Sequence, residues 1–315
     1  MKRALAALLC VSPVFAADPP QMVISNSAVK AIVYVPDAAS GYYRATRFDW
    51  AGAMASVDWN GHNFFGQWFE RYDPKINDSI TGPVEEFGEL GYKDAALGET
   101  FVKIGVGALQ RSSDAPYDKF HTYDIVDAGK WVVIAGTDHV EFRHTLASTN
   151  GYAYEYRKNV VLLNNGIALE HTLRNTGMKV IKTDVYDHDF FMLDAKPTGP
   201  DFSIKLPFAP KATADLKGLA QIRDKEISFT KELGPRDTVL TDLTGFSNAT
   251  TDYSIQVENR AAGVGVRQTS DRGMSKLVLW SIRNTVCPEA YIDINVEPGE
   301  QFRWIVSYQF YNLPK

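Results

Sequence analysis

Cysteine is scarce in this sequence, which has two cysteines, Cys10 and Cys287, among 315 residues. Cys10 lies in an N-terminal segment that we expect to be cleaved, so the mature chain would keep only Cys287 and could form no internal disulfide. A domain of this length buries enough apolar surface to fold without disulfides. We expect Cys287 to be a small buried side chain and not a nucleophile.

Blocks of like charge are also absent. The chain has 33 Lys and Arg against 38 Asp and Glu, a net charge of −5 with no basic patch, which excludes nucleic acid as an expected partner. No His-x-x-x-His pair and no paired cysteines occur, so we expect no metal and no cofactor. Asp73, Asn77 and Asp78 could supply oxygen ligands to calcium, but a plain polar loop is the commoner outcome of such a stretch.

Long apolar runs are missing after residue 16. At the N-terminus, Lys2 and Arg3 precede the apolar segment 4–14, which is too short to span a membrane as a stable helix. Ala16 supplies the small residue of a cleavage site. This pattern predicts a secretory signal peptide over residues 1–16 and a periplasmic or secreted mature chain with no membrane anchor. Export without disulfides fits a bacterial periplasm, and the sequence specifies no oligomeric state.

Helical periodicity is nearly absent, whereas short runs rich in Val, Ile, Thr, Tyr and Phe recur with turn residues between them. The segment 212–219 is the best helix candidate. The segment 70–91, rich in charge, Pro and Gly, is expected to be a loop. No linker and no internal repeat divide the chain. We therefore predict that residues 17–315 form a single all-β domain, a large antiparallel β-sandwich with very little helix.

One predicted hairpin, residues 168–194, groups polar side chains. Two strand-like runs flank the turn Asn175-Thr176-Gly177. Alternation along the second run puts a carboxylate, a phenol, an imidazole and a phenyl ring on one face, namely those of Asp184, Tyr186, His188 and Phe190. Such a face predicts the floor of a polar binding site.

This hairpin resembles the galactose mutarotase (aldose 1-epimerase) superfamily, in which a turn of Asn-Thr-Gly character precedes a His-Pro-Tyr-Phe motif. Here the motif reads His188-Asp189-Phe190-Phe191, without the Pro and with Phe in place of Tyr. A second match lies near the C-terminus, where Glu289 beside a Pro is followed by Pro298-Gly299-Glu300 and by Trp304. The Pro precedes Glu289 here, whereas in the superfamily it follows. Together the two matches imply the mutarotase-like β-sandwich for most of the mature chain.

The resemblance also implies a chemistry. Glu289 would be the base that removes the proton of the anomeric hydroxyl, and His188 the acid that protonates the ring oxygen, so that the sugar ring opens and closes again as the other anomer. Arg44 or Arg47 resembles the early sugar-binding Arg of the superfamily. The Asp that holds sugar hydroxyls would be Asp242 or Asp237.

One feature of the superfamily, a second His in a His-Gly motif, is missing. The corresponding region reads Gly82-Pro83-Val84-Glu85-Glu86-Phe87, and in an extended chain only one of Glu85 and Glu86 would face a site. His121 arrives later and could compensate. Tyr186, on the face of His188, completes the set of expected substrate-binding residues.

The leading hypothesis is an aldose 1-epimerase-like isomerase acting on a carbohydrate. A second is a lyase on the same fold, in which a base near Tyr186, His188 or His121 abstracts a proton while an Arg neutralises the substrate. A third is a non-catalytic carbohydrate-binding protein. Glu289 and His188 facing each other across a sugar-sized gap would favour epimerisation, an Arg-rich floor with a Tyr would favour elimination, and an open aromatic shelf would favour binding alone.

Overall fold

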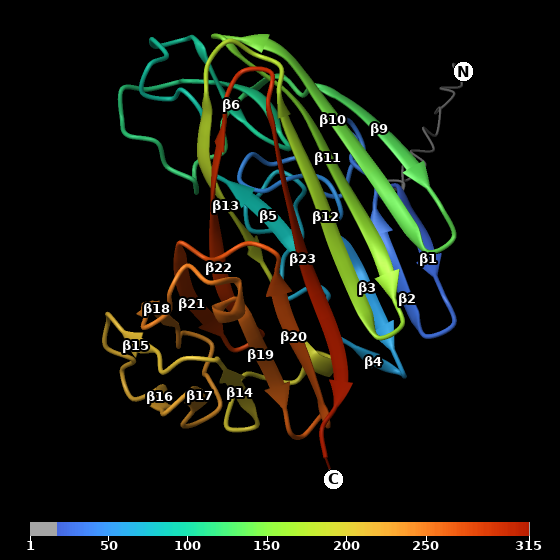
Figure 1. The fold of residues 1–315 in the computed structure, drawn as a ribbon, viewed down its shortest axis with the longest axis vertical. Coiled ribbons are helices and arrows are strands. Elements are labelled where there is room, and N and C mark those ends of the chain that lie inside the picture. The colour runs from blue at the N-terminus through green and yellow to red at the C-terminus, as the bar shows by residue number, and fades with distance from the viewer. Residues whose placement is uncertain (1–17, 315) are drawn as a thin grey trace, which may run out of the picture.

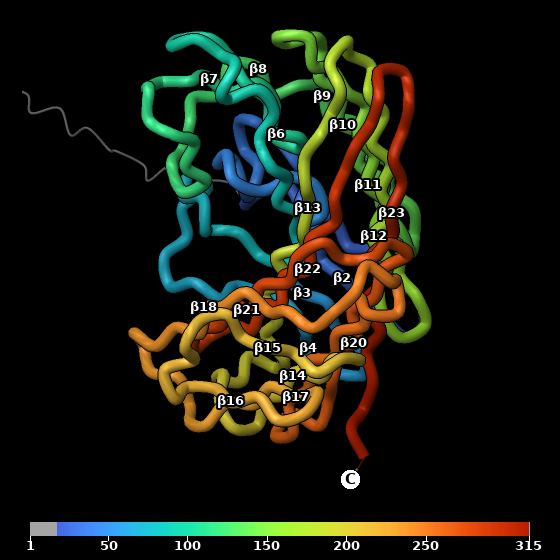
Figure 2. The backbone as a smooth tube through the Cα atoms, turned by 60° about the vertical axis from the view of Figure 1, so that its left-hand side comes forward, coloured from blue at the N-terminus to red at the C-terminus, as the bar shows by residue number. Residues whose placement is uncertain are grey.

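The computed structural model describes residues 18–314, so the predicted signal peptide lies outside the described residues and export stays a prediction. The described chain is built of antiparallel strands with two single-turn 3₁₀ segments, Leu193–Ala195 and Thr250–Asp252. Figure 1 shows the longest strands lying side by side, and Figure 2 shows β13 and β22 in a layer beside the one that holds β11, β12 and β23. The prediction of an all-β antiparallel sandwich is confirmed.

A ten-stranded sheet forms one layer. Its order is β16 (Ala220–Arg223), β17 (Glu226–Phe229), β14 (Phe202–Lys205), β19 (Ser254–Asn259), β20 (Val264–Ser270), β23 (Gln301–Asn312), β12 (Gly166–Asn175), β11 (Tyr152–Leu163), β10 (His139–Thr149) and β9 (Lys130–Ala135). Neighbours in this sheet pair in antiparallel register, for example Leu169 with Val306.

A six-stranded sheet forms the second layer. Its order is β15 (Lys211–Ala212), β18 (Val239–Thr244), β21 (Lys276–Ile282), β22 (Thr285–Val296), β13 (Ile181–His188) and β5 (Val84–Phe87). Two smaller sheets complete the fold: β1 (Gln21–Ser25), β2 (Val29–Tyr34), β3 (Met54–Trp59) and β4 (His62–Asn63), and β6 (Thr100–Lys103), β7 (Gly107–Gln110) and β8 (Ile125–Asp127).

The main core lies between the two large sheets. Trp304, Val306, Tyr308 and Phe310 are buried on alternate positions of β23, as expected for a strand with one face in a core. Phe87 of β5 meets this face, with ring centroids 5.4 Å from Tyr156 and 6.1 Å from Trp304. These contacts set the distance between the two sheets. They thereby also position the polar outer face of the six-stranded sheet.

The predicted helix over 212–219 is wrong. Residues 211–212 form β15, and the Thr241 hydroxyl accepts hydrogen bonds from the backbone N–H groups of Thr213 and Ala214. Lys217 has a φ of 54°, which ends any right-handed helical turn. A segment this short cannot offset the cost of helix nucleation when strand pairing competes for its backbone.

The expected loop 70–91 is partly wrong, because it contains β5. This strand pairs with the C-terminal half of β13, with Glu86 opposite Tyr186 and Glu85 opposite Asp187. All four residues of β5 are buried. The sequence of β5 shows no alternation of apolar and polar residues, because both of its faces are covered. Its charged side chains can be buried on either face, since other elements of the fold supply their ionic partners.

Candidate functional site

The floor of the candidate site is the face of the six-stranded sheet that points away from the main core. One row of side chains crosses four of its strands, with Asp242 opposite Val278 and Val278 opposite Glu289. His188, at the end of β13, continues this row beside Glu289. These four residues line a cavity of about 640 Å³, which we call the acid–base cavity. Its size lies within the range of about 300 to 1,000 Å³ that is usual for small-molecule sites.

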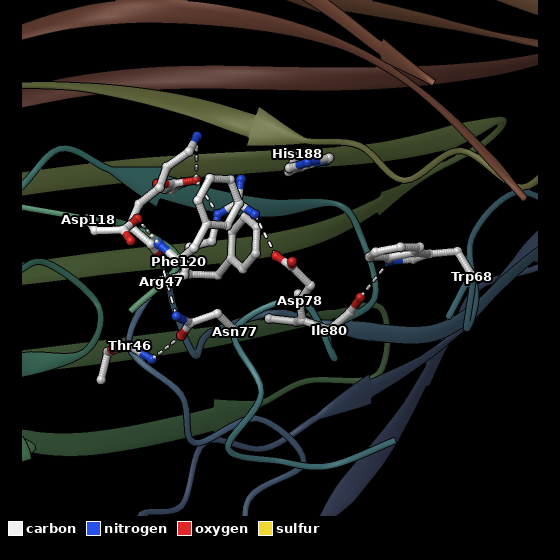
Figure 3. A network of polar contacts seen from close by, with 12 residues as sticks. Thr46, Arg47, Trp68, Asn77, Asp78, Ile80, Asp118, Phe120 and His188 are labelled. Atoms are coloured by element: carbon white, nitrogen blue, oxygen red, sulfur yellow. Dashed lines mark hydrogen bonds and ion pairs between the residues drawn. The ribbon is translucent and has the colours of Figure 1, made fainter. Parts of the chain in front are cut away.

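Loops that precede β8 in the sequence form the walls of the acid–base cavity. They contribute Arg47, Trp68, Asp78, Lys119 and Phe120. Figure 3 shows Arg47, Phe120 and Asp78 close together, with His188 and Trp68 nearby. Phe120 is 61% exposed and lies over the Arg47 guanidinium, so the mouth of the cavity presents an aromatic ring to solvent.

Aromatic rings surround His188. Its imidazole stacks on Phe190, with ring centroids 3.8 Å apart, and Trp280 meets it edge-on at 5.3 Å. Trp68 in turn stacks on Phe190 at 4.7 Å. These contacts restrict the imidazole to one plane, and the indoles of Trp68 and Trp280 give the cavity apolar surfaces of the kind on which sugar rings pack.

His188 and Glu289 are in direct contact. His188 Nε2 lies 3.2 Å from Glu289 Oε1, and the two residues are 3% and 5% exposed. The sequence led us to expect a sugar-sized gap between them, and the structure instead places them side by side on adjacent strands. The reason is the register of β13 and β22, which pairs Tyr186 with Tyr291. Two residues further along, on the same face of the sheet, His188 therefore lies opposite Glu289.

Burial moves both groups toward their uncharged forms. It raises the pKa of Glu289 to about 7, while Lys119 and Arg47 act in the opposite direction. Burial lowers the pKa of His188 well below its usual value, and the charges of Arg47 and Lys119 lower it further. The pair therefore holds one proton below about pH 7 and loses it as the pH rises through that value. His188 Nδ1 has no hydrogen-bond partner among the described residues to fix the tautomer.

Arg47 is held by three polar partners. Its Nε donates to Glu86 Oε2 at 2.8 Å, one Nη donates to Asp78 Oδ1 at 2.5 Å and the other to the Tyr186 hydroxyl at 3.2 Å. The segment that carries it is irregular, because the Tyr43 hydroxyl accepts the backbone N–H groups of Arg47 and Phe48. Arg47 thus brings a fixed positive charge to the cavity wall.

Of the two candidate arginines, Arg44 lies elsewhere. Its Nη1 donates to the carbonyl of Ala39 at 2.6 Å, and it lines a separate cavity with Trp50 and Thr122. The sequence left open whether Arg44 or Arg47 corresponds to the sugar-binding Arg of the superfamily. The structure brings Arg47, and not Arg44, to the cavity of His188 and Glu289.

Glu85 and Glu86 point to opposite faces of β5, as alternation requires. Glu85 is fully buried in the core, where it accepts a hydrogen bond from His171 Nε2 at 2.7 Å and contacts the Lys158 ammonium. Burial raises its pKa, but Lys158 and His171 outweigh this and hold the pKa at about 2. Neither Glu85 nor Glu86 lines the acid–base cavity. Glu85 lies in the core, so its expected contact with substrate has no support in this geometry, whereas Glu86 contacts Arg47 on the opposite side of β5.

The remaining predicted residues are distributed around the site. Tyr186 contacts the carboxylate of Glu86 with its hydroxyl and stacks on Tyr291 at 4.3 Å. Asp242 lies on the far wall of the cavity, half exposed and 3.7 Å from the Lys276 ammonium. His121 is exposed, packs edge-on against Tyr123 and does not line the cavity.

Several lining residues were not found from the sequence, namely Trp68, Asp78, Lys119, Phe120 and Trp280. Trp280 alternates with Val278 along β21, so the period of two that places Val278 on the floor could have found it. Lys119 and Phe120 directly precede His121 in the sequence. Asp78 is used by Arg47, and Asn77 Oδ1 accepts the N–H of Thr46. Within residues 18–314 no group of three or more His, Cys, Asp or Glu is arranged to hold a metal ion.

Comparison with solved structures finds relatives of the same architecture at low identity. The Slr1438 protein from Synechocystis is 13% identical and has a TM-score of 0.60, with 96% of this chain and 99% of that chain covered. A GalM/aldose epimerase homologue from C. elegans is 12% identical with a TM-score of 0.58, and 93% and 99% of the two chains are covered. Galactose 1-epimerase from Lactobacillus acidophilus NCFM is 12% identical with a TM-score of 0.51, and 93% and 95% are covered.

No protein-family model and no curated protein matches the chain in sequence. In the part of the chain that the structure describes, we find no helix that is both long and apolar enough to span a membrane. The solved structures match nearly the whole chain with TM-scores above 0.5, which shows a shared fold. The chain therefore has the galactose mutarotase-like fold, as its resemblance to that superfamily implies.

Proposed function

We propose that the protein is a carbohydrate-active isomerase of the aldose 1-epimerase type, with Glu289 and His188 as its acid–base pair. The observation that supports this most directly is the buried contact of 3.2 Å between a carboxylate and an imidazole on the floor of a cavity with aromatic walls. A carboxylate whose pKa is raised to about 7 is suited to accept a proton near neutral pH.

The direct contact between the two side chains is compatible with ring opening. The anomeric hydroxyl and the ring oxygen of an aldose are bonded to the same carbon, so neighbouring groups can reach both atoms. Glu289 takes the hydroxyl proton as the bond between C1 and the ring oxygen breaks, and protonated His188 gives a proton to that oxygen. Rotation about the C1–C2 bond and the reverse steps close the ring as the other anomer and restore the pair.

This mechanism requires the pair to hold one proton in total. That proton can lie on either residue, because Oε1 and Nε2 are within hydrogen-bond distance and nothing in the described structure fixes Nδ1. Arg47 and Lys119 lower the pKa of His188 and so make its protonated form a stronger acid. Asp242 and Arg47, which line the cavity, remain the expected contacts for sugar hydroxyls, and Glu86 holds Arg47 in place.

The lyase alternative gains less support. A base at Tyr186 would need its phenolate, but burial and the charges of Glu86 and Glu289 raise the pKa of Tyr186 well above its usual value. His121, a second candidate base, lies outside the cavity, and His188 is the one candidate base for elimination that lines it.

The test is saturation transfer between anomeric protons of common aldoses, measured by NMR with the purified mature protein. We expect faster exchange with the wild type than with Glu289→Gln or His188→Asn. Glu155→Gln, an exposed carboxylate on β11, is the matched control and should behave as the wild type. A protein that binds sugars but accelerates no anomer exchange would be a carbohydrate-binding protein. New absorbance from an unsaturated product would instead indicate a lyase.

A further inference from the structure

The floor of the site continues beyond the acid–base pair along two neighbouring strands. In β13 and β22, Tyr186 pairs with Tyr291, Asp184 with Asp293 and Lys182 with Asn295. These pairs point to the same side of the sheet as His188 and Glu289, because side chains alternate along a strand. From His188 to Lys182 the strand advances six residues, or about 20 Å at its usual rise.

A second cavity of about 780 Å³, which we call the outer cavity, lies over these pairs. Its lining includes Lys182, Asp184, Tyr186, Asp293 and Asn295. Lys119 and Tyr291 line both cavities. The two cavities are therefore neighbours on one face of one sheet, and together they are longer than a single sugar ring requires.

A row of aromatic and cationic side chains marks the boundary between the cavities. Tyr186 and Tyr291 stack at 4.3 Å, the Lys119 ammonium lies 5.6 Å from the Tyr186 ring, and the Lys276 ammonium lies 4.9 Å from the Tyr291 ring. Lys119 and Lys276 are partly exposed, so their donors are available to a ligand that passes from one cavity to the other.

The outer cavity also offers unused hydrogen-bonding groups. No hydrogen bond or ion pair to another described side chain engages the carboxylates of Asp184 and Asp293, which face each other across the two strands. Four carboxylates line the outer cavity, those of Glu86, Glu89, Asp184 and Asp293, against two ammonium groups, those of Lys119 and Lys182. An excess of carboxylates accepts hydroxyl groups well and repels anions. Glu86 is different, because Arg47 and Lys119 offset its charge.

We propose that the substrate is a neutral oligosaccharide, whose terminal ring occupies the acid–base cavity and whose following rings lie over Tyr291 and against Asp184 and Asp293 in the outer cavity. Placing the reducing end at His188 and Glu289 rests on the proposed isomerase function. The occupation of the outer cavity by further rings rests on the continuity of the two cavities alone. We expect acidic oligosaccharides to bind less well than neutral ones, because more carboxylates than ammonium groups line the outer cavity.

Calorimetric titration with reducing sugars of increasing length tests the proposal. The probes are glucose and galactose, then maltose, cellobiose and lactose, then maltotriose and cellotriose, with trigalacturonate as the acidic trisaccharide. We expect at least one neutral trisaccharide to bind about tenfold or more tightly than its own monosaccharide, because the outer rings add contacts. Trigalacturonate should bind no better than the monosaccharides. Equal affinity for all lengths, or preference for trigalacturonate, would overturn the proposal.

Variants locate the additional rings. Asn295→Trp fills the outer cavity from an exposed strand position and should reduce trisaccharide affinity to that of the monosaccharide, while monosaccharide affinity is unchanged. Thr145→Trp, exposed on β10, is the matched control and should bind as the wild type. The double variant Asp184→Asn, Asp293→Asn should gain affinity for trigalacturonate. Full trisaccharide affinity in Asn295→Trp would show that the rings lie elsewhere.

The two proposals can fail separately. Accelerated anomer exchange with no length dependence of binding would uphold the isomerase and reject the extended substrate. Tight trisaccharide binding that Asn295→Trp abolishes, with no anomer exchange for any sugar, would uphold the extended site and reject the isomerase.

Discussion

At the scale of single residues, the proposed function depends on one proton shared by two side chains. His188 and Glu289 are buried within hydrogen-bond distance, and both have a pKa displaced toward the uncharged form. An isolated carboxylate or imidazole on the surface would titrate independently. In this pair the two groups titrate together. The rate of anomer exchange should therefore depend on the number of protons that the pair holds, and not on the pKa of either group alone.

The first prediction concerns pH. The pair needs one proton for the ring oxygen, and it loses that proton as the pH rises through about 7, the pKa to which burial raises Glu289. We therefore expect kcat/KM for anomer exchange to fall about tenfold for each pH unit well above this value. Exchange rates from NMR between pH 5 and 9, corrected for the uncatalysed reaction, provide the measurement. A rate that keeps increasing above pH 8 would contradict the shared-proton mechanism.

At the scale of elements, side chains alternate along β13, so that some of its polar groups face the site and others face the core. His188 and Tyr186 face the site, whereas Asp187 faces the core, and Asp189 just beyond the strand does the same. The Tyr308 hydroxyl of β23 lies 2.6 Å from Asp187 Oδ2 and 2.8 Å from Asp189 Oδ1. A phenol donates only one hydrogen bond, so at least one of these carboxyl groups must be protonated to satisfy both contacts.

The second prediction concerns Asp187, which loses its proton before Asp189, because burial and the charge of Asp187 raise the pKa of Asp189 well above its usual value. Burial and the charge of Glu85 raise the pKa of Asp187 to about 6, so its stabilising effect is complete below the unfolded pKa of about 4 and is lost as the pH rises through 6. Asp187→Asn keeps the shape and removes the titration. Between pH 4 and pH 7 the Tm of the wild type should therefore fall by several degrees relative to the Tm of this variant.

Thermal unfolding followed by circular dichroism at constant ionic strength measures that difference. Asp224→Asn, at an exposed turn, serves as the control and should show no such shift. A Tm difference for Asp187→Asn that is the same at every pH would mean that Asp187 is ionised in the folded protein.

At the scale of the whole molecule, buried charge connects the two large sheets. Glu85 of β5 contacts Lys158 of β11 and His171 of β12, and the side chains of all three have 0% exposure. Lys158 Nζ also donates to the carbonyl of Ala51 at 3.0 Å. Burying these charges costs free energy that only their mutual contacts offset, so the cluster specifies how the sheets pack more than it adds to stability.

The third prediction is that removal of one partner is costly. Lys158→Met leaves Glu85 with His171 alone in the core and should reduce the free energy of unfolding by about 3 to 5 kcal/mol. Urea denaturation is the measurement, and Lys130→Met, exposed on β9, is the control. The double variant Lys158→Met, Glu85→Gln should recover part of the loss, because it removes the unpaired charge. A loss below about 1 kcal/mol in the single variant would show that water or a rearrangement replaces Lys158.

The sequence by itself determined the fold class and the composition of the floor of the site. Alternation along 179–191 put Asp184, Tyr186 and His188 on one face, and that periodicity is local, since side chains of any extended strand alternate. The same rule said that only one of Glu85 and Glu86 could face the site. It failed at 212–219, where pairing with a distant strand replaced a weak helical preference.

Only the tertiary structure decided which of these groups meet. The contact of His188 with Glu289 depends on the register of two strands about 100 residues apart. The Tyr43 hydroxyl holds the segment that carries both arginines, and only Arg47 lies at the acid–base cavity. Glu86 faces the site and Glu85 the core because β5 joins the edge of β13 in one register. Strand register between distant segments is set by the packing of the whole core, and no local pattern carries that information.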